Sequence, residues 1–328
     1  MSCAYELDKP ATSGMLYHRG VIRVELSQKA HMKSQIRSLD IVRDYLHKLR
    51  WDPLFQWQLL AGLQATLSVW VVQATQQDQG ITLLALVIWG GAAICIEDQL
   101  EHFQVRPSSA SFLAGITLLA YATWRSCLVL DLDAAVYVLP LIQGIGLGLL
   151  ARPVRELFSF RPALIVLSLF PLQFLAFKLL PEYWLSVTTG KFGQALLWII
   201  GVNTVSSGRM LVAGAQGVSI EPSCSGAGQI AQLAVIAIVF CMAYPIKSVR
   251  GKALFLLFAP VLGYFVNVIR IGLLALIVGS TIPYKDQLFD FFHDEWGGLV
   301  FSGIATVILG QIYMVMVERQ IASRNAEI

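Results

Sequence analysis

ALFLLFAPVLGYFVNVIRIGLLALIVG, residues 253–279, is a run of 27 residues with a single charged side chain, Arg270. A helix rises about 1.5 Å per residue, so about 20 apolar residues cross the hydrocarbon core of a bilayer, which is about 30 Å thick. The run therefore predicts a transmembrane helix. Arg270 needs an explanation, because a charge within a membrane span is costly.

Composition extends this prediction to the rest of the chain. Of the 328 residues, 56% are hydrophobic and 14% are charged, whereas soluble domains carry about 25% charged residues. The mean hydropathy is +0.65. A net charge of +3 is too small to indicate a nucleic-acid partner. The first 50 residues are polar and basic, and we expect no cleaved signal peptide there.

Eight segments have roughly the length and hydrophobicity of membrane helices. They are 54–75, 81–96, 110–130, 134–151, 162–180, 226–244, 253–279 and 297–317. With the N-terminus inside, Lys and Arg are concentrated in the cytoplasmic loops at every turn, as the positive-inside rule requires. The sequence thus predicts an all-α, polytopic membrane helix bundle of about eight transmembrane helices with cytoplasmic N- and C-termini.

This topology divides the chain into three parts. Residues 1–53 form a basic cytoplasmic segment, in which residues 36–50 can form an amphipathic helix. Residues 54–317 form the transmembrane domain, and residues 318–328 form a short cytoplasmic tail.

Two of the predicted outer loops are long. Residues 181–225 contain an apolar patch, 195–202, too short to span the bilayer. We interpret it as an interfacial or re-entrant helix, with a plain connecting loop as the alternative. The second long loop, 280–296, is acidic and aromatic.

The stretch EPSCSG, residues 221–226, precedes one of the predicted spans on its outer side. Pro222 suits a first helical turn, so we expect Cys224 to lie in the first turn of that span. Free N–H groups and the helix dipole favour the nucleophilic thiolate there. Most cysteines in membrane spans are packing residues, so this stretch alone leaves both roles open. We interpret the other cysteines as packing residues: Cys3, Cys95, Cys127 and Cys241.

Arg270 lies 18 residues after Lys252, which places it about 27 Å along the helix and in the outer third of the membrane. Its side chain either snorkels to the outer surface or serves as a fixed cation beside the thiol, where it stabilises developing negative charge. Asn267, one turn earlier on the same face, can hydrogen-bond nearby groups.

His293 is the only histidine that this topology places on the outer side, just before the last span and next to acidic residues that can orient its ring. A solvated loop histidine is the alternative. A nucleophile, a cation and an acid/base thus reach one layer from three separate helix ends. Neither a metal site nor a phosphate loop has the required ligand spacing, so we expect no metal and no cofactor.

The ordered set PSCSG (222–226), NVIR (267–270) and His293 ahead of the final span resembles the exosortase/archaeosortase family of membrane transpeptidases. The resemblance covers about residues 54–317. The glutamine-rich first span and IEDQLEHF (96–103) are similar to the cyanobacterial branch.

The resemblance implies a membrane-embedded cysteine protease or transpeptidase without a cofactor. Its substrates would be exported proteins with a C-terminal sorting signal of the PEP-CTERM type: a short Pro-Glu-Pro motif, a hydrophobic helix and a basic tail. Cys224 would form a thioester, Arg270 would stabilise the oxyanion, and His293 would transfer protons. An amine or amino-lipid acceptor would resolve the thioester, at the periplasmic or extracytoplasmic face of the plasma (inner) membrane.

Two other classes of function remain as alternatives. A transporter or lipid flippase predicts charged residues at mid-membrane in several helices and inverted repeats between the halves of the chain. A non-catalytic membrane assembly subunit predicts that Cys224 is replaceable.

Overall fold

The structure is a computed structural model that describes residues 52–76, 79–100, 104–128, 134–214, 216–244 and 246–326. The chain forms two compact units, Met1–Gln58 and Leu59–Ile328. Of the first unit, only residues 52–58 are described, and they include the beginning of helix α2. The predicted amphipathic helix at 36–50 lies outside the described residues.

The eight segments expected to be membrane helices are all helical, which confirms an all-α membrane protein. They correspond to α2 (Pro53–Gln76), α3 (Gln79–Leu100), α4 (Ser109–Cys127), α5 (Ala134–Ala151), α6 (Arg161–Leu179), α8 (Ala227–Ala243), α9 (Val249–Gly279) and α11 (Glu295–Ala326). A 3-10 turn, η1 (Val154–Phe160), precedes α6.

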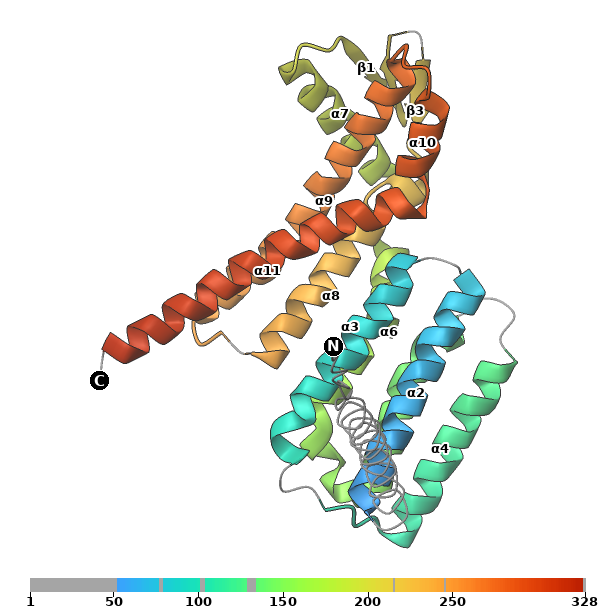
Figure 1. Cartoon of the computed structure of the whole chain (residues 1–328), viewed down its shortest axis with the longest axis vertical. Helices are drawn as coiled ribbons and strands as arrows, with labels where there is room; N and C mark the ends of the chain where they lie inside the picture. Colours follow the sequence, from blue (N-terminus) through green and yellow to red (C-terminus); the bar gives the residue numbers. More distant parts are fainter. Residues whose placement is uncertain are drawn as a thin grey trace, which may run out of the picture. The chain divides into compact units, whose positions relative to one another are not determined.

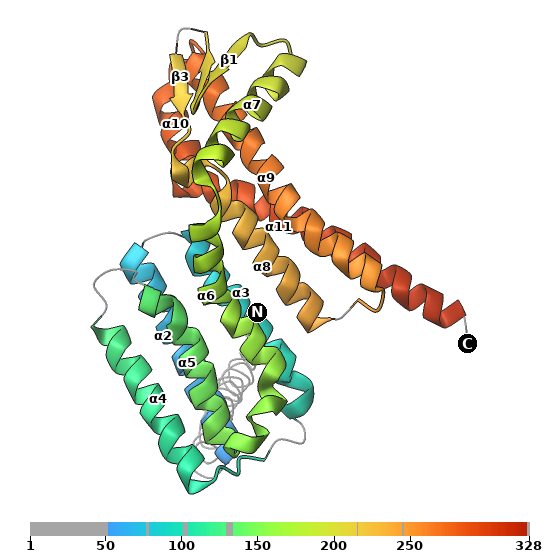
Figure 2. The ribbon, with the colours of Figure 1, turned by 180° about the vertical axis from the view of Figure 1, so that it is seen from behind.

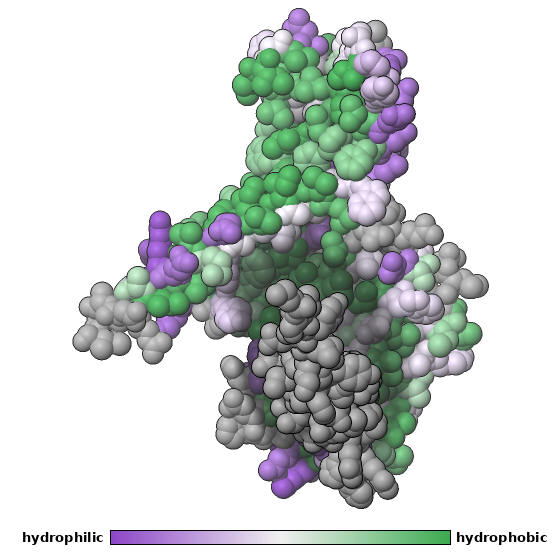
Figure 3. Space-filling view, viewed as in Figure 1, coloured by the Kyte–Doolittle hydropathy of each residue, from purple (hydrophilic) through white to green (hydrophobic). Residues whose placement is uncertain are grey.

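Four segments of the described chain are helical, long and apolar enough to cross a membrane: Gly80–Glu97, Val154–Leu179, Val249–Gly279 and Trp296–Ser323. Two shorter apolar helices are Ala135–Ala151 and Ala227–Ala243. Figure 3 shows hydrophobic side chains along α11, where Val300, Ile304 and Val307 are exposed, as on a lipid-facing surface. The count of eight spans and the cytoplasmic position of the termini stay predictions.

Helix α9 contains the longest candidate membrane span among the described residues, and it packs closely against α8. A Cβ atom at Gly263 would lie 2.7 Å from the backbone oxygen of Gln229, so only glycine allows this approach. The main core is shared with the other helices of the bundle: Leu84 of α3, Phe170 of α6, Leu233 of α8 and Leu309 of α11 are fully buried in it.

The C-terminal half of α9 is surrounded by α7 (Glu182–Ile199), a small sheet and α10 (Lys285–His293), as both ribbon views show (Figures 1 and 2). The predicted loop 280–296 therefore contains a helix, α10. The apolar patch 195–202 overlaps the end of α7, which is longer than the short interfacial helix we expected. Whether α7 lies at a membrane interface stays a prediction.

The sheet is the part of the fold that the sequence did not predict. Three antiparallel strands, β1 (Thr204–Ser207), β2 (Met210–Ala213) and β3 (Gln216–Ser219), follow one another in order. Gly208, with φ of +57°, turns the chain between β1 and β2. Leu211 of β2 is buried with Ile271 and Leu274 of α9, so this sheet covers the end of α9 that carries the site.

We predict opposite effects for alanine at two helical glycines. Gly263→Ala lowers the free energy of unfolding by about 1–3 kcal/mol, because the new methyl group meets the backbone of α8. Gly303→Ala is neutral or stabilising, since nothing lies within 4 Å of its Cβ position and alanine favours helix. Thermal unfolding of both variants in detergent measures this, and an equal effect would contradict the close α8–α9 contact.

Candidate active site

Cys224 ends a short 3-10 turn, η2 (Pro222–Cys224), and precedes α8. Gly226 follows with φ of +97°, and α8 begins at Ala227. The expectation that Cys224 lies in the first turn of the long helix is therefore wrong. A left-handed residue cannot continue a right-handed helix, so Gly226 separates the cysteine turn from α8. The Cys224 side chain is 7% exposed and packs with Leu211 and Ile271.

Side chains from two other helices hold the cysteine turn in place. Asn267 Nδ2 of α9 donates to the Cys224 carbonyl at 2.9 Å, and Thr189 Oγ1 of α7 donates to the Ser225 carbonyl at 2.9 Å. Asn267 and Thr189 are buried. A Cβ at Gly226 would lie 2.9 Å from Asn267 Nδ2 and would press on this contact. The carbonyls of the turn are thus satisfied inside the protein, as buried polar groups require.

Arg270 holds the turn that carries His293. Its Nε donates to the Phe292 carbonyl at 3.0 Å, and its Nη2 donates to the carbonyls of His293 and, at 3.5 Å, Asp294. These carbonyls lie at the C-terminal end of α10, where a helix attracts cations. Arg270 is 8% exposed, so the interpretation that its side chain snorkels to the surface is wrong. Its charge is compensated inside the protein.

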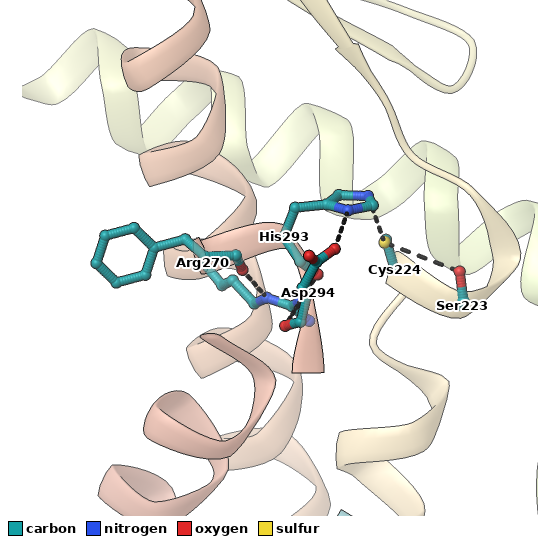
Figure 4. A network of polar contacts seen from close by, with 6 residues as sticks. Ser223, Cys224, Arg270, His293 and Asp294 are labelled. Carbon is teal, nitrogen blue, oxygen red and sulfur yellow. Dashed lines mark hydrogen bonds and ion pairs between the residues drawn. The ribbon is translucent and has the colours of Figure 1, made fainter. Parts of the chain in front are cut away.

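The imidazole of His293 lies between a carboxylate and the thiol (Figure 4). Nε2 is 4.0 Å from Cys224 Sγ, and Nδ1 is 3.5 Å from Asp294 Oδ1. The ring stacks on Phe289, one turn earlier in α10, with centroids 5.1 Å apart. The carboxylate favours a proton on Nδ1, which leaves Nε2 free to accept the thiol proton. This arrangement suits a thiol activated by a general base.

A cavity of about 840 Å³ opens beside the thiol. Its lining includes Cys224, Gln173, Gln229, Arg270, His293 and Asp294. It is bounded by the first turns of α3, α5, α8 and α11 and by the last turns of α6. In the alternating topology these turns all lie at the same end of the bundle, the end predicted to face outward. In that topology, the cavity therefore lies at one end of the bundle.

The structure brings together Cys224, Arg270 and His293, the three residues singled out in the sequence. Asp294, one of three acidic residues that could orient the ring, is the one beside Nδ1. Sequence reasoning missed Thr189, a threonine within a segment that gave no sign of its contact. Among the described residues, no group of three or more His, Cys, Asp or Glu side chains could hold a metal ion.

We predict that Asn267→Leu loosens the cysteine turn. The substitution leaves the buried Cys224 carbonyl without its donor, which costs about 1–3 kcal/mol, and it should lower the unfolding temperature in detergent. We also expect faster alkylation of Cys224 by iodoacetamide, measured in a chain whose other cysteines are alanine. Unchanged stability and unchanged alkylation would contradict the anchoring role.

Comparison with known proteins places the chain in a family. Residues 54–310 match the family model described as transmembrane exosortase (Exosortase_EpsH). No curated protein gives a significant match, and no solved structure does. The match covers well over half of the chain and includes the cysteine turn, the Asn267–Arg270 face of α9 and the His293 turn. The chain therefore belongs to the transmembrane exosortase family.

Proposed function

We propose that the protein is a cysteine transpeptidase that cleaves a C-terminal sorting signal of exported proteins within this cavity. The family is one of membrane peptidases and transpeptidases. The observation that carries the proposal is the 4.0 Å approach of His293 Nε2 to Cys224 Sγ at the wall of the cavity. Catalytic hydrogen bonds are often long without substrate and shorten in the substrate complex.

In the first half of the reaction, His293 Nε2 takes the thiol proton and Cys224 Sγ attacks the scissile carbonyl carbon. The carbonyl becomes a tetrahedral oxyanion. As it collapses, the C–N bond breaks, and the imidazolium gives its proton to the departing amine of the C-terminal fragment. The N-terminal part of the substrate stays on Cys224 as a thioester.

In the second half, an acceptor amine attacks the thioester carbonyl. His293 removes a proton from the amine, the C–S bond breaks, and the thiolate recovers that proton. The products are a new amide and the free thiol. Water in place of the amine gives a carboxylic acid, which makes the same site a protease. The family resemblance implies that the acceptor is an amine or an amino-lipid.

Arg270 fits two tasks in this scheme. Its Nε and Nη2 hold the His293 turn, while the contacts given by the described residues leave Nη1 for the oxyanion. Arg270 lines the same cavity as Cys224 and Asp294, so its positive charge lies beside the reacting centre. Gly298 lies beside Nη1, where an added Cβ would be at an ordinary contact distance of 3.8 Å. A donor aimed at developing charge is among the largest contributions to catalysis.

The position of the cavity suits a substrate that spans the membrane. The sorting signal that the family resemblance implies has its scissile bond just before a hydrophobic helix. Such a bond lies at the bilayer surface, at the depth where helix ends are found. We place this end of the bundle at the extracytoplasmic face of the plasma (inner) membrane, because exported substrates reach that side.

The transporter alternative gains no support: Arg270 is the one charged side chain among the buried described residues.

We predict that Cys224→Ala abolishes removal of the tail from a co-expressed reporter. The reporter is an exported domain that ends in a Pro-Glu-Pro motif, an apolar helix and a basic tail. His293→Ala should slow tail removal about 10²–10⁴-fold, the usual range for a lost general acid–base. Cys241→Ala is the matched control, because Cys241 is buried in α8 away from the cavity. Undiminished cleavage by Cys224→Ala would refute the proposed function.

We predict that Arg270→Lys affects both the position of the His293 turn and the rate of tail removal. A lysine cannot reach several carbonyls with a planar fork, so the His293 turn should shift, and iodoacetamide alkylation of Cys224 should change in rate. Tail removal should fall about 10²-fold or more, as for other lost oxyanion donors. If alkylation keeps its wild-type rate while cleavage falls, Arg270 does not position His293 and acts on the oxyanion alone.

A further inference from the structure

Two glutamines in the cavity wall have amide groups that the site described above does not use. Gln229, the third residue of α8, is 9% exposed, and neither its Oε1 nor its Nε2 has a hydrogen-bond partner among the described residues. The Oε1 atom of Gln173 in α6 is buried and unpartnered in the same sense. Both residues line the cavity. Burying amides without partners is costly, so these groups are suited to a ligand.

In the predicted topology, the two glutamines lie on the membrane side of the nucleophile. α8 leads away from the cysteine turn into the bundle, and Gln229 is five residues past Cys224 along that direction. Gln173 is six residues before the end of α6, which packs against α8. Phe174 and Phe177, also in α6, add apolar wall beside them. The charged groups of the cavity, Arg270 and Asp294, belong to other elements, α9 and the turn after α10.

A neutral amide among aromatic rings suits a neutral ligand that has hydrogen-bond donors. The first four N–H groups of any helix lack intrahelical partners. Inside a bilayer, no water replaces those partners. A substrate helix whose first turn enters this cavity would present its free N–H groups to side-chain oxygens, as a helix does to an N-cap residue.

We propose that Gln229 Oε1 and Gln173 Oε1 cap the first turn of the substrate's membrane helix. The cap fixes how far the helix enters, so that the peptide bond just before it lies at Cys224 Sγ. Gln229 Nε2 donates to a carbonyl of the extended segment ahead of the helix. The enzyme thereby selects a bond by its position relative to a helix start. This inference rests on the proposed function and names the glutamines as specificity-determining residues.

The test pairs an enzyme variant with a substrate variant. Gln229→Met keeps an unbranched side chain of similar length and removes the amide. In the reporter, proline at the second residue of the apolar helix removes one free N–H while the helix stays intact, since proline is tolerated in a first turn. The initial rate of tail removal is measured for all four combinations, and alkylation of Cys224 by iodoacetamide reports an intact thiol site.

We expect each single change to lower the rate about tenfold, the effect of one lost hydrogen bond that leaves its partner unpaired. The double combination should be no slower than Gln229→Met alone, because that variant already lacks the contact that the proline removes. Alkylation should be unchanged. Tyr264→Phe is the matched control. It removes a buried hydroxyl of α9 that lies outside the cavity and has no hydrogen-bond partner among the described residues, so this variant should process the reporter at the wild-type rate.

Several outcomes would overturn the cap. Gln229→Met could process the reporter at the full rate, or the rate reductions caused by the enzyme change and the reporter change could multiply. A thioester on Cys224 could accumulate in Gln229→Met, which would assign the amide to the acceptor instead. If Gln229→Met does not fold, the unmodified enzyme is tested with reporters that have proline throughout the first turn of the apolar helix. Processing of these reporters at the full rate would also overturn the cap. Tail removal by Cys224→Ala would show instead that the proposed function has failed.

Discussion

One face of α9 holds the two halves of the site together. Asn267 donates to the carbonyl of Cys224, and Arg270, three residues later, donates to the carbonyls of Phe292 and His293. Residues three apart lie on the same side of a helix, one above the other. The cysteine turn and the histidine turn come from distant parts of the chain, and this pair of side chains fixes both against one rigid element.

The energetics of Arg270 explain why this arrangement is stable inside an apolar bundle. A buried guanidinium without partners would be strongly destabilising. Here its hydrogens meet carbonyls at the end of α10 that would otherwise lack intrahelical donors. The cation and the helix end therefore satisfy each other. The same hydrogen bonds set the position of His293. They therefore both compensate the buried charge of Arg270 and position the proposed general base.

Much of this could be predicted from the sequence, for reasons that the structure makes plain. A continuous apolar run such as 253–279 is stable in a bilayer as a helix, so the helices could be predicted. Cys224, Arg270 and His293 could be singled out as candidates because a cysteine among turn residues, a charge in a span and a histidine at a helix end are each unusual there. The shared face of Asn267 and Arg270 on α9 followed from their spacing, and the resemblance to the exosortase family was confirmed.

Other features could not be predicted, because they depend on contacts that carry no local pattern. Strands of four residues are too short for alternation to stand out, so the sheet over α9 was missed. Proline at 222 suggested a helix start, but the positive φ of Gly226 ends that turn before α8. The partners of Arg270 are backbone carbonyls, which every residue has. The unpartnered amide of Gln229 becomes visible only once the surrounding helices enclose it.

The central claim is that Cys224 forms a covalent bond with the substrate in this cavity. Its most direct test is mass spectrometry of the Cys224 peptide from membranes that contain both enzyme and reporter, quenched in acid during turnover. We expect a Cys224 peptide that carries the reporter's last residues before the cleavage point and that hydroxylamine releases, as it does a thioester. Reporter cleavage with Cys224 found only as the free thiol, and equal cleavage when Cys224 is alanine, would contradict it.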